Sequence, residues 1–420
     1  MARPEPRSPW EPLRRRALAE GLAAVAAPTL FLLLLLCSFG AAAQAPAEPP
    51  PIRIGIATMA PGEIFWERFG HNAIVVDDPA RGVPLSYNFG FFDLTEPGFV
   101  GRFVQGDMQY MLAVLPFEQD LAYYRETGRG VSIQWLDLPP ARARALAESL
   151  AINALPENAR YSYDYFTDNC STRVRDALDE ALGGLLHERL ASPATIDGNT
   201  WRSEAVRLAS PAGWMWLGFD LGLGPRADVP LTAWQEAFVP MRLADSLRGV
   251  RLADGRPLVR AEKVLLPHRL TPEPAFAARP WWPWALGGML VAVAIVGLGR
   301  WKPRVLAGLA LSFWLLCGLL GALMLFLWCC TSHWSGWENR NLLVYGPLCL
   351  LAIPGAWRIA RGRPPGRWFA PALAVIAVAA CVALLLHLVV GAQDNLRWIG
   401  LLLPVHVAFW AAWRRARVPA

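Results

Sequence analysis

Beyond the first 43 residues, apolar runs long enough to cross a lipid bilayer are confined to the last third of the chain. Residues 44–280 contain no run that approaches the ~20 apolar residues a spanning helix needs. Five candidate spans follow, at Trp281–Gly299, Val305–Trp328, Leu342–Trp357, Pro371–Ala392 and Ile399–Trp413. The third and fifth are short and contain proline, so their ends are poorly defined. The pattern predicts an aqueous folded region over residues 44–280 and an all-α membrane bundle over residues 281–413.

The first 43 residues have the pattern of an export signal. Basic residues at Arg14–Arg16 precede the apolar core Leu30–Leu36, and the small residues Ala41–Ala43 follow it. This order is typical of a secretory signal peptide, with cleavage expected after Ala43. An uncleaved N-terminal anchor is the alternative. Both interpretations deliver residues 44–280 to the far side of the membrane.

Positive charge in the loops between the spans predicts their orientation. Loops on the cytoplasmic side carry an excess of arginine and lysine. Basic residues gather in alternate connections and in the tail, at Arg300, Lys302, Arg304, Arg358, Arg361, Arg363, Arg367, Arg414, Arg415 and Arg417. The other two loops carry Arg340 and Arg397 alone. We therefore expect residues 414–420 in the cytoplasm, and the loops 329–341 and 393–398 on the side of the exported region.

The overall charge does not indicate a nucleic-acid partner. The chain has a net charge of +6, but only two of its 40 basic residues, Lys263 and Lys302, are lysines. No stretch reads as a basic face with interleaved aromatic residues, so nucleic acid is not an expected partner. Asp77 and Asp78 precede Pro79, a pattern more typical of a turn than of a metal site. We expect no metal and no cofactor.

One cysteine stands out in the exported region. Of the seven cysteines, Cys170 alone lies in residues 44–280, and an unpaired exported thiol is a candidate nucleophile. Apolar residues recur at helical spacing after it, and Asp168 or Asn169 suits a helix N-cap. Cys170 is therefore expected in the first turn of a helix, where the dipole lowers a thiol pKa. The first-turn amides of this helix terminus, at Asn169 and Ser171, are candidates for holding an oxyanion.

A cysteine nucleophile needs a base, and His71 is the best candidate. His187 lies at a polar helix end, and His268 precedes a proline-rich linker. His71 begins an apolar strand that leads into the turn at residues 77–79, and a second strand follows it. The resulting hairpin places Asn88 near His71, where its amide oxygen can orient the imidazole. A structural strand histidine is the alternative interpretation of His71.

Three motifs together resemble a known family. They are Gly70-His71, Tyr87-Asn88-Phe89-Gly90-x-Phe92-Asp93 and Asp168-Asn169-Cys170-Ser171-Thr172-Arg173. They resemble circularly permuted NlpC/P60 domains, in which the histidine precedes the Asn-Cys helix. More closely, the chain resembles the family with an Lnb-type N-terminal periplasmic domain, which pairs this Cys-His domain with a C-terminal membrane bundle.

The resemblance implies a fold and an activity. It implies an α+β, papain-like periplasmic domain at residues 44–195, followed by an accessory subdomain and linker at 196–280 and then five transmembrane helices in the inner membrane. It implies a lipoprotein N-acyltransferase that moves an acyl chain from a phospholipid to the N-terminal amine of a lipoprotein. Cys170, His71 and Asn88 would be catalytic. The exported loop carries His333, Asn339 and Asn341, which are candidates for substrate binding.

Two other functions fit the same residues. Many relatives of the permuted class are Cys-His peptidoglycan amidases or endopeptidases, which need only a membrane tether. A non-catalytic membrane scaffold is the other alternative. Five spans and a polar loop at the interface favour a lipid substrate over a polar polymer.

The charge pattern gives a direct test of membrane topology. Reporter fusions after Arg300, Arg361 and Ala420 should report the cytoplasm, whereas fusions near Ser335 and Asn395 should report the exported side. One reversed loop would separate His333 and Cys170 into different compartments and would exclude a site that uses both.

Overall fold

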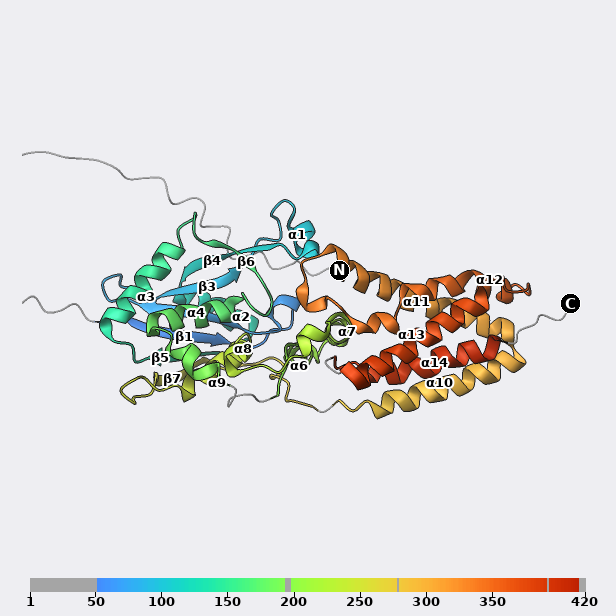
Figure 1. Ribbon diagram of the computed structural model, residues 1–420. Coiled ribbons are helices and arrows are strands. Elements are labelled where there is room, and N and C mark those ends of the chain that lie inside the picture. The colour runs from blue at the N-terminus through green and yellow to red at the C-terminus, as the bar shows by residue number, and fades with distance from the viewer. Residues whose placement is uncertain (1–50, 193–197, 278, 391–392, 415–420) are drawn as a thin grey trace, which may run out of the picture. The chain divides into compact units, whose positions relative to one another are not determined.

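The computed structural model describes residues 51–192, 198–277, 279–390 and 393–414. The expected signal or anchor at residues 1–43 lies outside the described residues. Seven antiparallel strands form one sheet in the order β6-β4-β3-β2-β1-β5-β7 (Figure 1). The strands are β1 Arg53–Met59, β2 His71–Asp77, β3 Leu85–Phe91, β4 Met108–Pro116, β5 Val131–Leu136, β6 Arg160–Tyr163 and β7 Val259–Leu266.

Nine α-helices accompany these strands within the described part of residues 51–280. They are α1 Phe99–Gln105, α2 Phe117–Thr127, α3 Pro140–Asn153, α4 Cys170–Leu182, α5 Leu185–Leu190, α6 Trp201–Ala209, α7 Gly213–Gly222, α8 Ala233–Glu236 and α9 Pro240–Gly249. The mixture of a sheet and helices is the α+β domain that the sequence predicts.

Alternation along the strands gives the sheet two apolar faces. Ile54 and Ile74 are buried on one face, in a core that also contains residues of α3, α4, α5 and α9. Ala57 and Val75 are buried on the other face, against α2. Successive side chains of a strand point to opposite faces, so strands that are buried on both sides become almost continuously apolar. The sheet therefore has one layer of helices on each side, with α4 on the first face and α2 on the second.

The last strand returns from far along the chain. Strand β7 pairs with β5, with Gln134 opposite Glu262. The expected accessory subdomain and linker over residues 196–280 thus contribute their final strand to the central sheet. A short hairpin turn at residues 253–256 is closed by a bridge between Arg251 and Pro257. The longer partner of β7 is β5, and no local turn signal could reveal that pairing.

The C-terminal part contains five helical segments that are long and apolar enough to cross a membrane. Their bounds, which include a third segment made of several short pieces, are Trp282–Trp301, Pro303–Cys330, Trp334–Ala360, Phe369–Val390 and Leu396–Trp413. The four unbroken ones are α10, α11, α13 and α14, and they lie beside one another (Figure 1). Each overlaps a span that the apolar runs predict.

The third segment is not a continuous α-helix. It consists of three short 3-10 turns, at Trp334–Gly336, Arg340–Leu343 and Pro347–Ala352, and then helix α12 at Ile353–Ala360. Proline has no amide hydrogen to donate and clashes with the preceding helical turn, so Pro347 and Pro354 fit at the starts of the pieces. The first piece of this segment lies within the loop 329–341, which the sequence places on the exported side.

Buried charges join helix α7 to the beginning of α14. Asp220 in α7 is fully buried. Its carboxylate accepts hydrogen bonds from Arg279 and from the indole of Trp398, both at 2.8 Å, and Arg397 lies 3.4 Å away. Helix α6 adds Arg202, which is also fully buried and pairs with Asp228 at 2.8 Å. Removing one member of such a cluster leaves the opposite charge buried without compensation.

This cluster yields a prediction about stability. The variant Asp220→Ala should lower the free energy of unfolding by about 3–5 kcal/mol, because the buried Arg397 and the partly buried Arg279 lose a carboxylate partner. Thermal unfolding of the purified full chain in detergent measures the effect. The matched control is Asp254→Ala, which removes an exposed pair with Arg256 and should leave the midpoint almost unchanged. Equal midpoints for the two variants would contradict a role for Asp220 in holding the two parts together.

Candidate active site

Helix α4 begins at Cys170 because Asn169 caps it. The Asn169 side-chain oxygen accepts hydrogen bonds from the amides of Ser171 and Thr172, at 2.8 and 3.0 Å. In return, the backbone amide of Asn169 donates to the Thr172 hydroxyl at 2.7 Å, which completes a capping box. The helix ends at Gly183, whose φ of 71° suits the left-handed C-cap. Cys170 thus occupies the first helical position, as the sequence predicts.

The side chains of Asn169 and Ser171 hold the helix in place. Asn169 donates to the carbonyls of Tyr165 and Phe238, at 2.8 and 2.9 Å. The Ser171 hydroxyl lies 2.8 Å from the Asn72 side-chain oxygen and 2.6 Å from the Ala237 carbonyl. The expected oxyanion role of Asn169 and Ser171 stays a prediction. The Ser171 amide is already engaged by the cap, and both side chains are committed to positioning α4.

The imidazole of His71 is held by a chain of polar side chains. Its Nε2 atom lies 3.0 Å from the Asn88 side-chain oxygen. The Asn88 amide nitrogen in turn donates to the Asp120 carboxylate in α2, at 3.1 Å. An amide oxygen only accepts hydrogen bonds, so Nε2 carries the proton and Nδ1 is left as the basic nitrogen. The predicted neighbourhood of His71 and Asn88 is therefore present in the structure.

Asp120 is a member of the site that sequence reasoning missed. It is buried on the face of α2 that covers the sheet. Burial raises the pKa of its carboxyl, against the hydrogen bonds from Ser86 and Asn88 and the nearby charge of Arg129. A carboxylate among the apolar residues of a helix indicates a candidate site residue. Its role can be assigned only when the strand that the helix covers is known.

His71 and Cys170 line the same cavity. Its volume is 130 Å³, and it also receives Gly90 and Asn169. Strand β3 is irregular between Asn88 and Phe91, and Gly90 there has a φ of 91°, which favours glycine. A Cβ atom at Gly90 would lie 3.5 Å from the Cys170 Cβ, so the backbone passes directly beside the thiol. The bulge thus brings the β3 backbone against Cys170, in the cavity that His71 also lines.

The electrostatics of the two groups differ from the expectation. Burial raises the pKa of the Cys170 thiol, although the backbone amides of Asn72, Ser171 and Cys170 favour the thiolate. Burial also lowers the pKa of His71 to about 4, against the hydrogen bond to Asn88. The expected lowering of the thiol pKa at the helix terminus is wrong, because desolvation outweighs the helix amides. At neutral pH the site holds a neutral thiol beside a neutral imidazole.

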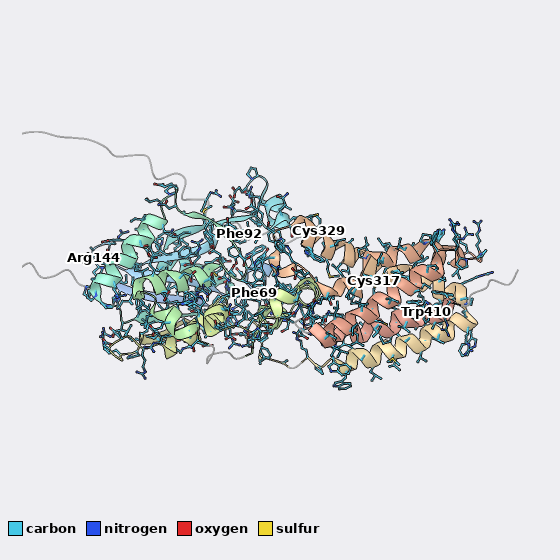
Figure 2. The ribbon with its side chains drawn as sticks, in the orientation of Figure 1. Phe69, Phe92, Arg144, Cys317, Cys329 and Trp410 are labelled. Carbon is cyan, nitrogen blue, oxygen red and sulfur yellow. The ribbon has the colours of Figure 1, made fainter. Side chains whose placement is uncertain are left out.

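Aromatic rings form the walls of this cavity. They come from β3, β4, β6 and the loops between helices, and Figure 2 labels two of them, Phe69 and Phe92. Tyr110 stacks on Phe92 and on Tyr163, with ring centroids 4.9 and 4.3 Å apart. The aromatic residues that line the cavity are Phe65, Trp66, Phe69, Phe89, Phe92, Phe103, Tyr110, Tyr163, Tyr165, Phe166, Phe219 and Phe238. Such walls exclude water and suit an apolar substrate.

The exported loop contacts the site differently from expectation. The ring of His333 stacks on Tyr165 at 6.0 Å, and its Nε2 atom lies 3.0 Å from the Phe103 carbonyl, so it supports the cavity wall from behind. Asn339 and Asn341 are buried and donate to the Leu221 carbonyl at 2.7 and 3.1 Å. The substrate-binding role of these two asparagines stays a prediction, and in this structure their side-chain amides join the loop to α7.

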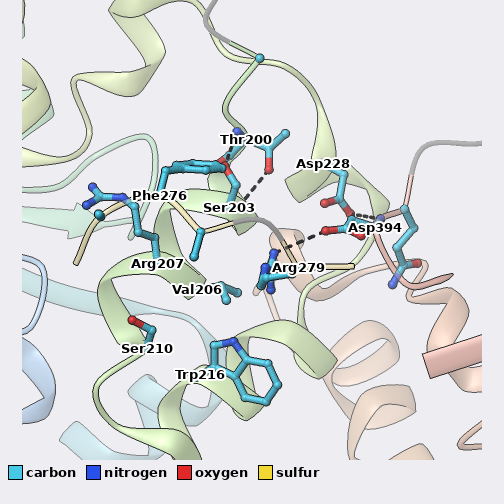
Figure 3. Close-up of a pocket in the computed structure, with 14 residues that line it drawn as sticks. Thr200, Ser203, Val206, Arg207, Ser210, Trp216, Asp228, Phe276, Arg279 and Asp394 are labelled. Atoms are coloured by element: carbon cyan, nitrogen blue, oxygen red, sulfur yellow. Dashed lines mark hydrogen bonds and ion pairs between the residues drawn. The ribbon is translucent and has the colours of Figure 1, made fainter. Parts of the chain in front are cut away.

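A second, larger cavity lies elsewhere. It has a volume of 520 Å³ and is lined by residues of α6, by residues 275–277 and 279, and by residues 393 and 394 before α14 (Figure 3). Its charged residues are engaged with one another. Arg279 reaches Asp394 at 3.4 Å, and the Asp228 carboxylate accepts from the Asp394 amide at 3.2 Å. Neither Cys170 nor His71 lines it, so it is not part of the Cys-His site.

The resting charge state gives a testable pH dependence. Alkylation of Cys170 needs the thiolate, so its rate should keep rising with pH through the usual thiol pKa of about 8.5. Mass spectrometry of the Cys170 peptide in the full chain measures the rate, with Cys170→Ser as the blank. A rate that is flat between pH 5 and 8 would reveal a preformed thiolate–imidazolium pair and would contradict the neutral state.

Comparison with protein families identifies both halves of the chain. The model of the Lnb N-terminal periplasmic domain matches residues 42–203, and the model of the Lnb transmembrane domain matches residues 278–410. No curated protein and no solved structure matches the chain. The two models together cover more than half of the sequence, in the order that the fold shows. The chain therefore belongs to the Lnb-type family of membrane proteins, in which a periplasmic domain precedes a transmembrane domain.

Proposed function

We propose that this protein is an inner-membrane acyltransferase that moves an acyl chain from a phospholipid to the amine of a lipoprotein N-terminal cysteine. The observation that carries the proposal is the shared cavity of Cys170 and His71, with the imidazole held by Asn88. The relation to permuted NlpC/P60 domains and the cytoplasmic C-terminus belong to the same proposal. Membership of a family with a periplasmic and a transmembrane domain supports it, because both substrates, a phospholipid and a lipid-anchored protein, lie at that membrane surface.

The first half of the reaction forms a thioester. As the Cys170 sulfur attacks the ester carbonyl of the phospholipid, Nδ1 of His71 takes the thiol proton. The backbone amides of Cys170 and Asn72 stabilise the charged form of the thiol. They also suit the negative oxygen of the tetrahedral intermediate. The ester C–O bond then breaks, and the protonated His71 gives its proton to the departing lysophospholipid oxygen. The enzyme is left acylated and His71 neutral.

The second half transfers the acyl chain to nitrogen. The amine of the lipoprotein cysteine attacks the thioester carbonyl, and an amide bond forms as the C–S bond breaks. His71 accepts one proton from the attacking amine and returns it to the Cys170 sulfur, which restores the resting thiol. The low pKa of His71 in the resting state keeps it unprotonated and ready to act as a base in both halves.

The narrow aromatic cavity favours acyl transfer over hydrolysis of a polar polymer. A peptidoglycan stem peptide carries charged and amide groups, and burying these without partners costs free energy. An acyl ester presents one polar carbonyl followed by methylene groups, which suits walls of phenylalanine and tyrosine. Water is also a competing acceptor for a thioester, and an apolar wall keeps it at low concentration.

Genetic complementation combined with mass spectrometry tests the proposal. The wild-type protein should restore growth to cells depleted of their essential apolipoprotein N-acyltransferase, and an amide-linked acyl chain should appear on a lipoprotein N-terminal peptide. Cys170→Ala should abolish the product, and His71→Ala should lower it by roughly 10²–10⁴-fold, the usual contribution of a general base. Asn88→Ala should cost less, because an orienting group does not take the proton. The matched control is Cys381→Ala, which removes an exposed cysteine of α13.

Two outcomes would overturn the proposal. Equal product from Cys170→Ala and wild type would exclude a cysteine nucleophile and favour a scaffold. Release of stem-peptide fragments from purified peptidoglycan, without acylation, would favour the amidase. Expression and membrane insertion of each variant are checked by immunoblotting of the membrane fraction.

A further inference from the structure

The cavity around Cys170 is too small for a whole lipid chain. Its 130 Å³ is well below the ~300–1,000 Å³ of pockets that enclose a complete drug-sized ligand. Only the reacting end of a long acyl chain fits beside the thiol. The remainder of the lipid must rest against a surface outside the cavity, and that surface has to be apolar.

Such a surface borders the cavity. Six exposed apolar residues, which we call the apolar collar, come from the turn before β2, from α1 and from α7. They are Ile64, Trp66, Val100, Val104, Trp214 and Leu217, with exposed fractions between 39% and 70%. Isolated exposed apolar side chains need no explanation, but a group of them that borders a cavity indicates an interaction surface.

Ring contacts connect the collar to the cavity walls. Trp214 stacks on Phe65 with ring centroids 5.9 Å apart, and Trp66 meets the face of Phe92 edge-on, also at 5.9 Å. Phe65, Trp66 and Phe92 all line the cavity. In α1, Phe99 stacks on Phe92 at 5.7 Å and on Phe103 at 6.3 Å. The exposed Val100 and Val104 directly follow these two phenylalanines of α1 in the sequence. The collar and the cavity are therefore parts of one continuous apolar surface.

Both ends of the collar are attached to the ends of membrane spans. On one side, Trp216 of α7 lies between Trp284 of α10 and Trp398 of α14, with ring centroids 6.3 and 6.4 Å away. Tryptophan is typical of the membrane–water boundary. On the other side, the amide of Ser332, two residues after α11 ends, donates to the Gln105 carbonyl at 2.7 Å. These contacts hold α1 and α7 at the level where the spans leave the bilayer.

We propose that the apolar collar is immersed in the periplasmic leaflet of the bilayer and that a phospholipid enters the Cys170 cavity across it, directly from the membrane. The attachment of both α1 and α7 to span ends selects the lipid surface over a protein partner. An apolar helix face at this level buries its side chains among the acyl chains at the headgroup boundary. The inference rests on the proposed function only for the fate of the lipid after entry.

Photocrosslinking of the full chain tests immersion without relying on activity. A benzophenone amino acid is placed at position 100, 104 or 214 of the protein reconstituted in phosphatidylethanolamine–phosphatidylglycerol vesicles. Matched controls are positions 152 in α3 and 264 in β7, whose native Ile152 and Val264 are 60% and 68% exposed. Phospholipid adducts should form at all three collar positions and not at the controls. Absence of adducts at the collar would overturn the proposal, even if the enzyme is active.

A second measurement tests lipid entry. The double variant Val100→Asp, Val104→Asp replaces apolar contacts by charges and should lower acyl transfer from vesicle phospholipid on the order of tenfold. Alkylation of Cys170 by a water-soluble reagent should keep its wild-type rate, which shows that the site is intact. Ile152→Asp is the control with unchanged transfer. Unchanged transfer in the double variant would overturn lipid entry across α1, whereas absence of transfer in wild type would refute only the proposed function.

Discussion

The buried carboxylate of Asp220 is the interaction on which the position of the site depends. Its arginine and tryptophan partners fix α7 against the start of α14. The next residue back, Phe219, lines the cavity and meets the ring of Phe69 at 5.5 Å, two residues before His71. A short path of packed groups therefore runs from the membrane bundle to the imidazole. A buried charge without a partner would be destabilising in this location. Each charge here has a partner of opposite sign, so the cluster holds α7 against the start of α14.

The resting site shows how burial competes with a helix terminus. Helix amides and a capping asparagine surround Cys170, and in water this arrangement would favour the thiolate. The aromatic walls remove water from both the thiol and the imidazole, and loss of hydration penalises a charged form of either group. The neutral pair is thus a direct result of the same apolar walls that suit an acyl substrate. In the proposed reaction, charge appears only as the sulfur attacks, when the proton passes to His71.

Local patterns in the sequence were enough for the hairpin that brings Asn88 to His71 and for the helix that begins at Cys170. Both depend on neighbours within about twenty residues, through turn chemistry, capping and apolar spacing. The apolar runs likewise predicted the five candidate spans. Asp120 could not be found this way, because its role depends on which strand α2 covers. The sequence predicts a ligand role for Asn339 and Asn341 because they are polar residues near the membrane surface. Their side chains donate to the backbone of α7, over a hundred residues away, and no local pattern predicts that contact.

The place of β7 has a consequence for the order in which the protein is built. Its partner β5 ends at Leu136, yet β7 begins at Val259, after helices α3 to α9 have been made. During export the edge of β5 therefore stays unpaired until the more than one hundred residues between β5 and β7 have crossed the membrane. Closure of that edge comes late, because β7 ends at Leu266 and α10 begins at Trp282. The sheet is thus completed just before the membrane spans are inserted. A chain halted before residue 259 would expose the unpaired edge of β5 to the periplasm, where other strands can pair with it.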